Sequence, residues 1–220
     1  MIMVMIFFLP YQEGDFSLNS MELFQKGGPV MYLLLLCSLS VAAIAIDRWL
    51  FYRRAMAGAE EVIRKLADAA RSGLSSVAVE GDNVAAFLLG AGARAQESGA
   101  DVRLAVESAY GEAAMKLRAR LNYLSMIVTL APLLGLLGTI SGMIDSFNIF
   151  SIAADQPLAI TAGIGEALIA TATGLCVAIF ALVVHTVLAS RMDVVLTLAD
   201  RAEAAVLSAA KANGGASDAA

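Results

Sequence analysis

Residues 163–173 read GIGEALIATAT and lead into an apolar run, Ala167 to Leu188, that has one histidine and no formal charge. An earlier run, Leu121 to Ile144, contains no charged residue at all. Each run is at least as long as the roughly 20 apolar residues that a helix needs to cross a membrane. Glu166 lies at the head of the later run. A carboxylate inside a membrane helix costs about 2 to 4 kcal/mol, so Glu166 is a functional-site hypothesis, and proton uptake and release is its simplest role.

The composition of the whole chain also indicates an integral membrane protein. Of its 220 residues 59% are apolar and 16% are charged, whereas about a quarter of the residues in soluble domains are charged. The net charge of -5 argues against a nucleic-acid partner. Cys37 and Cys176 fall in different apolar runs, so we interpret them as buried small hydrophobes and not as a disulfide or a metal-binding pair.

The apolar runs and the charges between them predict an all-α membrane protein with three transmembrane helices and long cytoplasmic helical extensions. The predicted segments are an N-terminal periplasmic segment (1–26), transmembrane helix 1 (27–46), a cytoplasmic helical region (47–120), transmembrane helix 2 (121–150), a periplasmic loop (151–159), transmembrane helix 3 (160–190) and a cytoplasmic C-terminal helix with a disordered tail (191–220).

Basic residues set the predicted orientation, because Lys and Arg concentrate on the cytoplasmic side of membrane proteins. Those that flank the predicted spans on one side are Arg48, Arg53, Arg54, Lys116, Arg118, Arg120 and Arg191. The loop 151–159 has no Lys or Arg, so the N-terminus and this loop are expected outside and the C-terminus in the cytoplasm. Residues 1–9 are apolar but too short to span, and an interfacial position is one interpretation of them.

Two separate helices are expected outside the hydrocarbon layer, and two of the spans are expected to continue beyond it as helix. Periodic apolar residues predict one over Ala57 to Arg71 and another over Val84 to Gln96, the latter capped by Asp82-Asn83. With no Pro or Gly pair to interrupt it, a single helix is expected to run from Asp101 to Phe150, through the second span. The third span is expected to continue as an Ala-rich helix over Met192 to Ala212.

Small residues recur at helical spacing in the second and third spans. They are Gly138 and Gly142 in the second, and Ala170, Gly174 and Ala178 in the third. Such patterns let helix backbones approach closely in lipid. Packing within one chain and packing between copies of the chain both remain open, although three spans are few to enclose a pore. Pro132 is expected to bend the second span or to leave a carbonyl free.

Hydroxyl groups accompany the carboxylate in these spans. The threonines of interest are Thr139, Thr171 and Thr173. A Thr hydroxyl in a helix often only bonds a carbonyl of the preceding turn, which is the structural alternative for each. Asp145 falls near the outer end of its span, where a hydrated position is expected. His185, the one histidine, lies about 28 Å along a helix from Glu166, and no HExxH spacing occurs, so an enzyme is disfavoured.

Two motifs in these spans resemble those of a known family. Residues 130–144, LAPLLGLLGTISGMI, and residues 163–175, GIGEALIATATGL, resemble the span-two and span-three signatures of the MotA/TolQ/ExbB proton-channel family. The resemblance extends from about Ser20 to Ala212. The expected topology is closer to the ExbB/TolQ branch than to MotA, which has four spans. Within that branch, the region of Glu166 and residues 21–29, MELFQKGGP, look closer to ExbB.

The resemblance implies a bacterial inner-membrane motor powered by the proton-motive force. It implies a ring of five copies, two copies of a single-span ExbD/TolR-like partner in the pore, a TonB/TolA-like transducer, and protons as the coupling ion without another cofactor. It also implies that Glu166, Thr139 and Thr171 line the pore. On an ideal helix Thr171 is about 140° around from Glu166 and Thr173 about 20° away. Helix geometry therefore favours Thr173 as the companion of Glu166 on one face, and we add it to the candidate pore residues.

Two other functions remain open beside ExbB-like energising of outer-membrane transport. One is a TolQ-like motor that maintains the cell envelope. The other is a membrane scaffold with no ion path, in which Glu166 pairs structurally with a cation of a partner. Membrane lipid surrounds the chain in each case. A scaffold would tolerate Glu166→Gln, whereas a proton path would not.

Overall fold

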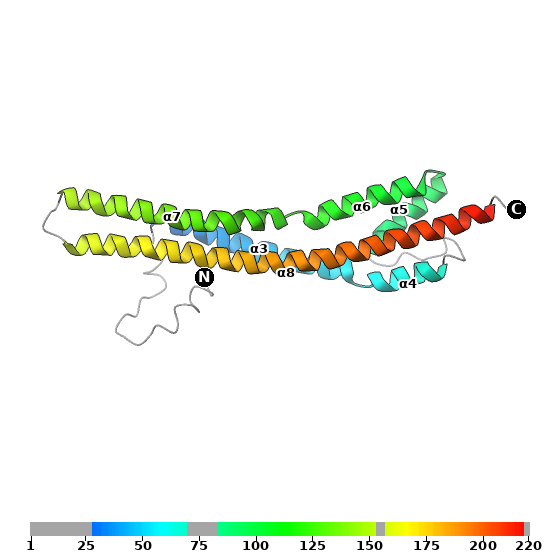
Figure 1. Cartoon of the computed structure of the whole chain (residues 1–220), viewed down its shortest axis with the longest axis horizontal. Helices are drawn as coiled ribbons and strands as arrows, with labels where there is room; N and C mark the ends of the chain where they lie inside the picture. Colours follow the sequence, from blue (N-terminus) through cyan, green and yellow to red (C-terminus); the bar gives the residue numbers. More distant parts are fainter. Residues whose placement is uncertain (1–27, 70–82, 153–156, 218–220) are drawn as a thin grey trace. The chain divides into compact units, whose positions relative to one another are not determined.

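The computed structural model describes residues 28–69, 83–152 and 157–217, and all regular elements in these ranges are α-helices (Figure 1). They are α3 (Val30–Met56), α4 (Ala59–Ala69), α5 (Val84–Ser98), α6 (Val102–Arg118), α7 (Leu121–Ile152) and α8 (Pro157–Ser217). Among the residues that the structure describes, three stretches, carried by α3, α7 and α8, are long and apolar enough to cross a membrane. In these ranges the prediction of an all-helical chain with three helices suited to span a membrane is therefore confirmed, and the predicted ring stays a prediction.

The chain forms two compact units. The span unit contains the described parts of residues 1–45 and 121–186, and the extension unit contains those of 46–120 and 187–220. Both α3 and α8 contribute residues to each unit. The predicted membrane spans therefore fall mainly in the span unit, and the predicted cytoplasmic helices in the extension unit.

In the span unit α3, α7 and the first part of α8 lie side by side (Figure 1). Their shared core contains small and branched side chains, such as Leu34, Val41, Leu124 and Ala170. Large apolar side chains cover the other faces of α7 and α8, including Leu133, Leu136, Leu137, Ile140, Ile144, Phe147, Ile164, Leu168, Leu175 and Ile179. Exposed apolar surface of this extent suits lipid or other membrane helices and not water.

In the extension unit α5 and α6 pack against one another as a hairpin with capped ends. The Asn83 side chain accepts a hydrogen bond from the Ala86 N–H at 2.9 Å, which confirms the predicted cap at this residue; Asp82 lies outside the described residues. Gly99 ends α5 in the left-handed conformation, and Asp101 caps α6. Residues of α8 complete the core, since Val206 packs close to Gly92 of α5.

The predicted uninterrupted helix from Asp101 to Phe150 is wrong. Helix α6 ends at Arg118 and α7 begins at Leu121, because Ala119 is extended (ψ 144) and Arg120 adopts a φ of 69. Side chains of α3 bind carbonyls at the break: Arg48 donates to the Lys116 carbonyl at 3.0 Å, and the Tyr52 hydroxyl donates to the Leu117 carbonyl at 2.8 Å. These tertiary contacts satisfy carbonyls at the end of α6 that a continuing helix would have used.

Other helix ends differ from the predicted ones by a few residues. Helix α4 begins at Ala59, after Gly58 at a φ of 73, and α5 continues to Ser98. Helix α7 reaches Ile152 and α8 starts at Pro157, since proline is tolerated in the first turn of a helix. Helix α8 extends to Ser217, past Gly214, where a disordered tail was predicted. The Ala-rich stretch that precedes Gly214 has high helix propensity and favours this continuation.

Candidate functional site

Small residues hold α7 and α8 unusually close together in the span unit. A methyl group added at Gly138 would lie 2.6 Å from Ala170 Cβ, and one added at Gly174 would lie 2.7 Å from the Ala131 carbonyl oxygen. Carbon atoms in ordinary contact are about 3.5–4.0 Å apart. The two glycines are therefore places where a larger residue would push the helices apart.

The same interface continues on both sides of this pair. A methyl group at Gly142 would lie 3.0 Å from Ala167 Cβ, and one at Gly135 would lie 3.1 Å from Thr171 Cα. Ala178 is buried as well. Gly138, Gly142, Ala170 and Gly174 thus serve packing within one chain, which was one of the two alternatives that the sequence left open. Gly135 was not singled out, although its spacing from Gly138 could have indicated it.

The three threonine hydroxyls all donate to backbone carbonyls. Thr139 Oγ1 donates to the Leu136 carbonyl at 2.7 Å, and Thr173 Oγ1 donates to the Ile169 carbonyl at 2.8 Å, both within their own helix. Thr171 differs, because its hydroxyl crosses to α7 and donates to the Gly135 carbonyl at 3.0 Å. Each hydroxyl oxygen keeps its capacity to accept a hydrogen bond. The threonines can therefore accept from water or from a protonated acid without breaking these bonds.

Glu166 lies in α8 between Gly163 and Ala167, two residues that adjoin Gly142 of α7. Its backbone is helical, and its side chain lies outside the described residues. Along α8, Thr173 follows Glu166 by about 10 Å, or two turns. The contacts between α7 and α8 therefore bring the backbone of Glu166 and all three threonines into one short section of the helix pair.

Pro132 lies inside α7 without ending it. Because proline has no N–H, the carbonyl of residue 128 receives no bond from residue 132. The neighbouring Ala131 carbonyl is the atom closest to a methyl group added at Gly174. Pro132 therefore lies next to one of the close contacts between α7 and α8, and the expected bend stays a prediction.

One acid among hydroxyls and apolar residues suits proton transfer better than bond-making chemistry. Within the ranges that the structure describes, no three His, Cys, Asp or Glu side chains come close enough to hold a metal ion. Glu166 is the one charged residue of the sequence between Asp155 and Arg191. Binding and release of a proton at Glu166 is the chemistry that these residue types offer.

Reasoning from the sequence missed a charged cluster in the extension unit. Asp47 Oδ2 lies 2.5 Å from Arg120 Nη1 and 3.0 Å from Arg48 Nε. The hydrogen bond from Arg120, supported by Arg48, lowers the pKa of Asp47 below its usual value. Burial raises the pKa of Tyr52, the residue that caps α6. The adjacent Asp47 and Arg48 at the end of the first apolar run were the available signal.

Comparison with known proteins gives consistent matches. The family model described as the MotA/TolQ/ExbB proton channel family matches residues 59–201. The ExbB-like 1 biopolymer transport protein of Synechocystis sp. is 38% identical over 176 residues, which are 76% of this chain and 69% of that protein. The Tol-Pal system protein TolQ of Pseudomonas aeruginosa is 37% identical over 94 residues, 40% of this chain and 41% of TolQ. ExbB of Salmonella typhimurium is 40% identical over 72 residues, 32% of this chain and 30% of ExbB.

Proposed function

Because the chain belongs to the MotA/TolQ/ExbB proton channel family, we propose that it is the channel-forming subunit of a motor in the bacterial inner membrane. The motor uses the proton-motive force to energise transport across the outer membrane, as its likeness to ExbB-type proteins suggests. The N-terminus is periplasmic and the C-terminus cytoplasmic, an orientation supported by the basic residues that flank the spans.

The observation that carries this proposal is Glu166 within the apolar α8, inside the family match. A charged carboxylate at this place is costly, and a proton that binds there removes the charge. Thr139, Thr171 and Thr173 offer acceptor oxygens within two turns. Protons that move between these groups and a partner's acid require no other cofactor.

A pore requires more than one copy of the chain, since its three spans pack against one another. We propose a ring of five copies around two copies of a single-span ExbD/TolR-like protein that brings an aspartate to the level of Glu166. A TonB/TolA-like protein then transmits the motion to the outer membrane. The large apolar faces of α7 and α8 that remain exposed in one chain support such an assembly.

Glu166→Gln tests the proton path because the amide keeps the size of the side chain and cannot carry the proton. Asp145→Asn is the matched control, an exposed acid of α7. The variants are expressed in a host strain whose own version of this protein has been deleted, and substrate uptake through an outer-membrane transporter is measured. Glu166→Gln is expected to abolish uptake and Asp145→Asn to preserve it. Native mass spectrometry is expected to show that both variant complexes are still assembled. Full uptake by an assembled Glu166→Gln complex would refute the proton path and favour a scaffold.

The 37% identity to TolQ supports a second candidate, a TolQ-like motor that maintains the envelope. Native mass spectrometry of the complex from its own membranes identifies the partner and its copy number. The same strain separates the two functions: loss of uptake indicates ExbB-like work, and leakage of periplasmic protein with defective division indicates TolQ-like work. A monomer that persists in several mild detergents would leave no pore and would contradict both.

A further inference from the structure

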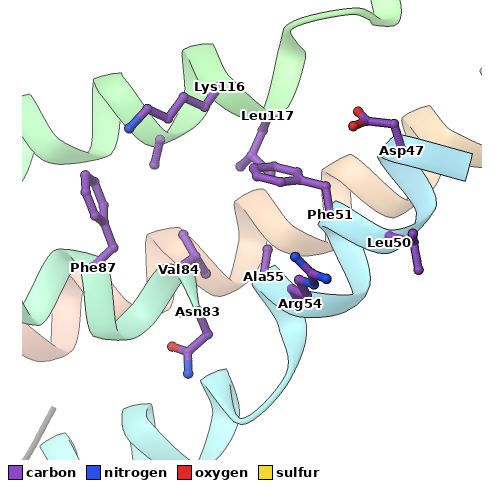
Figure 2. A pocket seen from close by; sticks show the side chains of 11 residues that line it. Asp47, Leu50, Phe51, Arg54, Ala55, Asn83, Val84, Phe87, Lys116 and Leu117 are labelled. Carbon is purple, nitrogen blue, oxygen red and sulfur yellow. The ribbon is translucent and has the colours of Figure 1, made fainter. Parts of the chain in front are cut away.

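A cavity of about 370 Å³ opens between α3, α5 and α6 in the extension unit (Figure 2). Its walls are mostly apolar and include Phe51 of α3, Val84 and Phe87 of α5, and Leu117 of α6. In Figure 2 the Phe51 ring points toward Leu117, on the opposite wall. A cavity of this size and lining suits a ligand that has a hydrocarbon part.

Two cations, Arg54 and Lys116, also line the cavity. Lys116 Nζ is 2.6 Å from Glu112 and 5.3 Å above the Phe87 ring. Asp47, the one acid of the lining, is already bound by Arg48 and Arg120. Within the described part of the chain, no ion pair engages Arg54. The cavity thus combines an apolar wall with a cation that lacks an acidic partner there.

The position of the cavity along α3 places it at a membrane surface. Helix α3 runs from Val30 to Met56 and so continues past residue 46, where the first membrane span is predicted to end after the roughly 20 residues that cross the hydrocarbon layer. Residues 50–55 therefore lie about one to two turns beyond Asp47, on the cytoplasmic border of the predicted span. Trp49 marks the same level, with the Arg191 guanidinium 5.3 Å from its ring, as aromatic residues do at membrane interfaces.

We propose that this cavity binds one anionic phospholipid. The phosphate lies between Arg54 and Lys116, and the upper part of an acyl chain lies against Phe51, Val84 and Leu117. Opposite charges select the anionic head, and the apolar wall distinguishes a lipid from a soluble phosphate. The site requires α3 to cross a membrane but does not require the proton path at Glu166, so the two proposals can fail separately.

The test uses the full-length complex in mild detergent with added phosphatidylglycerol or phosphatidylcholine. Native mass spectrometry counts the lipids retained per copy of the chain. Arg54→Gln is compared with Arg53→Gln, which removes the same charge from the neighbouring exposed residue of α3 that does not line the cavity. Lys116→Gln is a second variant, less clean because it also releases Glu112.

The wild type is expected to retain phosphatidylglycerol and to lose phosphatidylcholine. Arg54→Gln should lower retention about fivefold, the effect of one basic residue near an anionic surface, and the double variant with Lys116→Gln should lower it further. Arg53→Gln should change it less than about twofold. Equal losses in the Arg53 and Arg54 variants would show attraction by the basic surface in general and would overturn the site. Equal retention of the two lipids by the wild type would overturn it as well.

Discussion

Gly138→Ala should destabilise the pairing of α7 and α8, and the structure says by how much the helices must move. The added methyl group would lie 2.6 Å from Ala170 Cβ, about 1 Å closer than two carbon atoms pack. Overpacking of this kind costs about 1–3 kcal/mol, whereas the better helix propensity of alanine returns less than about 1 kcal/mol. A net loss of about 1–2 kcal/mol is expected.

A compensating variant turns this expectation into a sharp test. Gly138→Ala combined with Ala170→Gly moves one methyl group from α8 to α7 and conserves the total volume. The remaining neighbours of the new methyl group are atoms of Val30 at 3.7 and 3.8 Å, an ordinary contact distance. The double variant should therefore recover to within about 0.5 kcal/mol of the wild type, with a coupling energy of about 2 kcal/mol.

Equilibrium unfolding in mixed micelles with sodium dodecyl sulfate provides the measurement, and Trp49, the one tryptophan of the chain, reports on it by fluorescence. Gly165→Ala is the matched control on α8, since, apart from its chain neighbours and the backbone of its own helix, no described atom lies within 4 Å of the position of its added methyl group. Gly138→Ala should unfold at lower detergent fraction than Gly165→Ala. The reasoning is refuted if the two variants unfold together, or if Ala170→Gly fails to restore Gly138→Ala.

Two further substitutions test other contacts. Asp47→Asn removes the acid whose pKa Arg120 and Arg48 lower. A lowered folded-state pKa stabilises the fold above the unfolded pKa, and this stabilisation is lost as the pH falls through the folded pKa, so the wild type should lose it below about pH 4 and the variant should lack it at every pH; for a solvent-screened pair the difference is under about 1 kcal/mol. Unfolding measured as a function of pH checks this, and the same change of stability with pH in both proteins would contradict it. Thr171→Val removes the hydrogen bond to the Gly135 carbonyl of α7 and should cost about 0.6 kcal/mol of stability. Thr173→Val should cost less, because the Thr173 hydroxyl bonds within its own helix. Equal unfolding midpoints of the two variants would count against an interhelical role for Thr171.

The helices themselves follow from local sequence, which is why most of them could be predicted. Uncharged runs of membrane length mark α7 and the first part of α8, and Asn83 marks the start of α5. The break between α6 and α7 could not be found in this way. Nothing at residues 119 and 120 disfavours a helix, and the Tyr52 and Arg48 side chains that bind the last carbonyls of α6 come from about 65 residues earlier in the chain.

The candidate site shows the same division between local and tertiary information. Glu166 was recognisable because a carboxylate in an apolar run is conspicuous in any sequence. The role of Thr171 was not, because a hydroxyl that bonds its own helix and one that bonds a neighbouring helix have the same sequence signature. Helix α7 had to be placed against α8 before the Thr171 hydroxyl could be assigned to the Gly135 carbonyl.

The close pairing of α7 and α8 also restricts which faces could meet in the proposed ring of copies. Gly138 and Gly142 are already filled by Ala170 and Ala167 of the same chain, so these glycines cannot also receive a helix from another copy. The faces left for neighbours carry large apolar side chains such as Leu133 and Ile140. A substitution at Gly138 or Gly142 should therefore lower first the stability of the single subunit. A substitution on the apolar faces should instead lower the number of copies in the proposed ring. Measurements of unfolding and of copy number on the same variants separate these two effects.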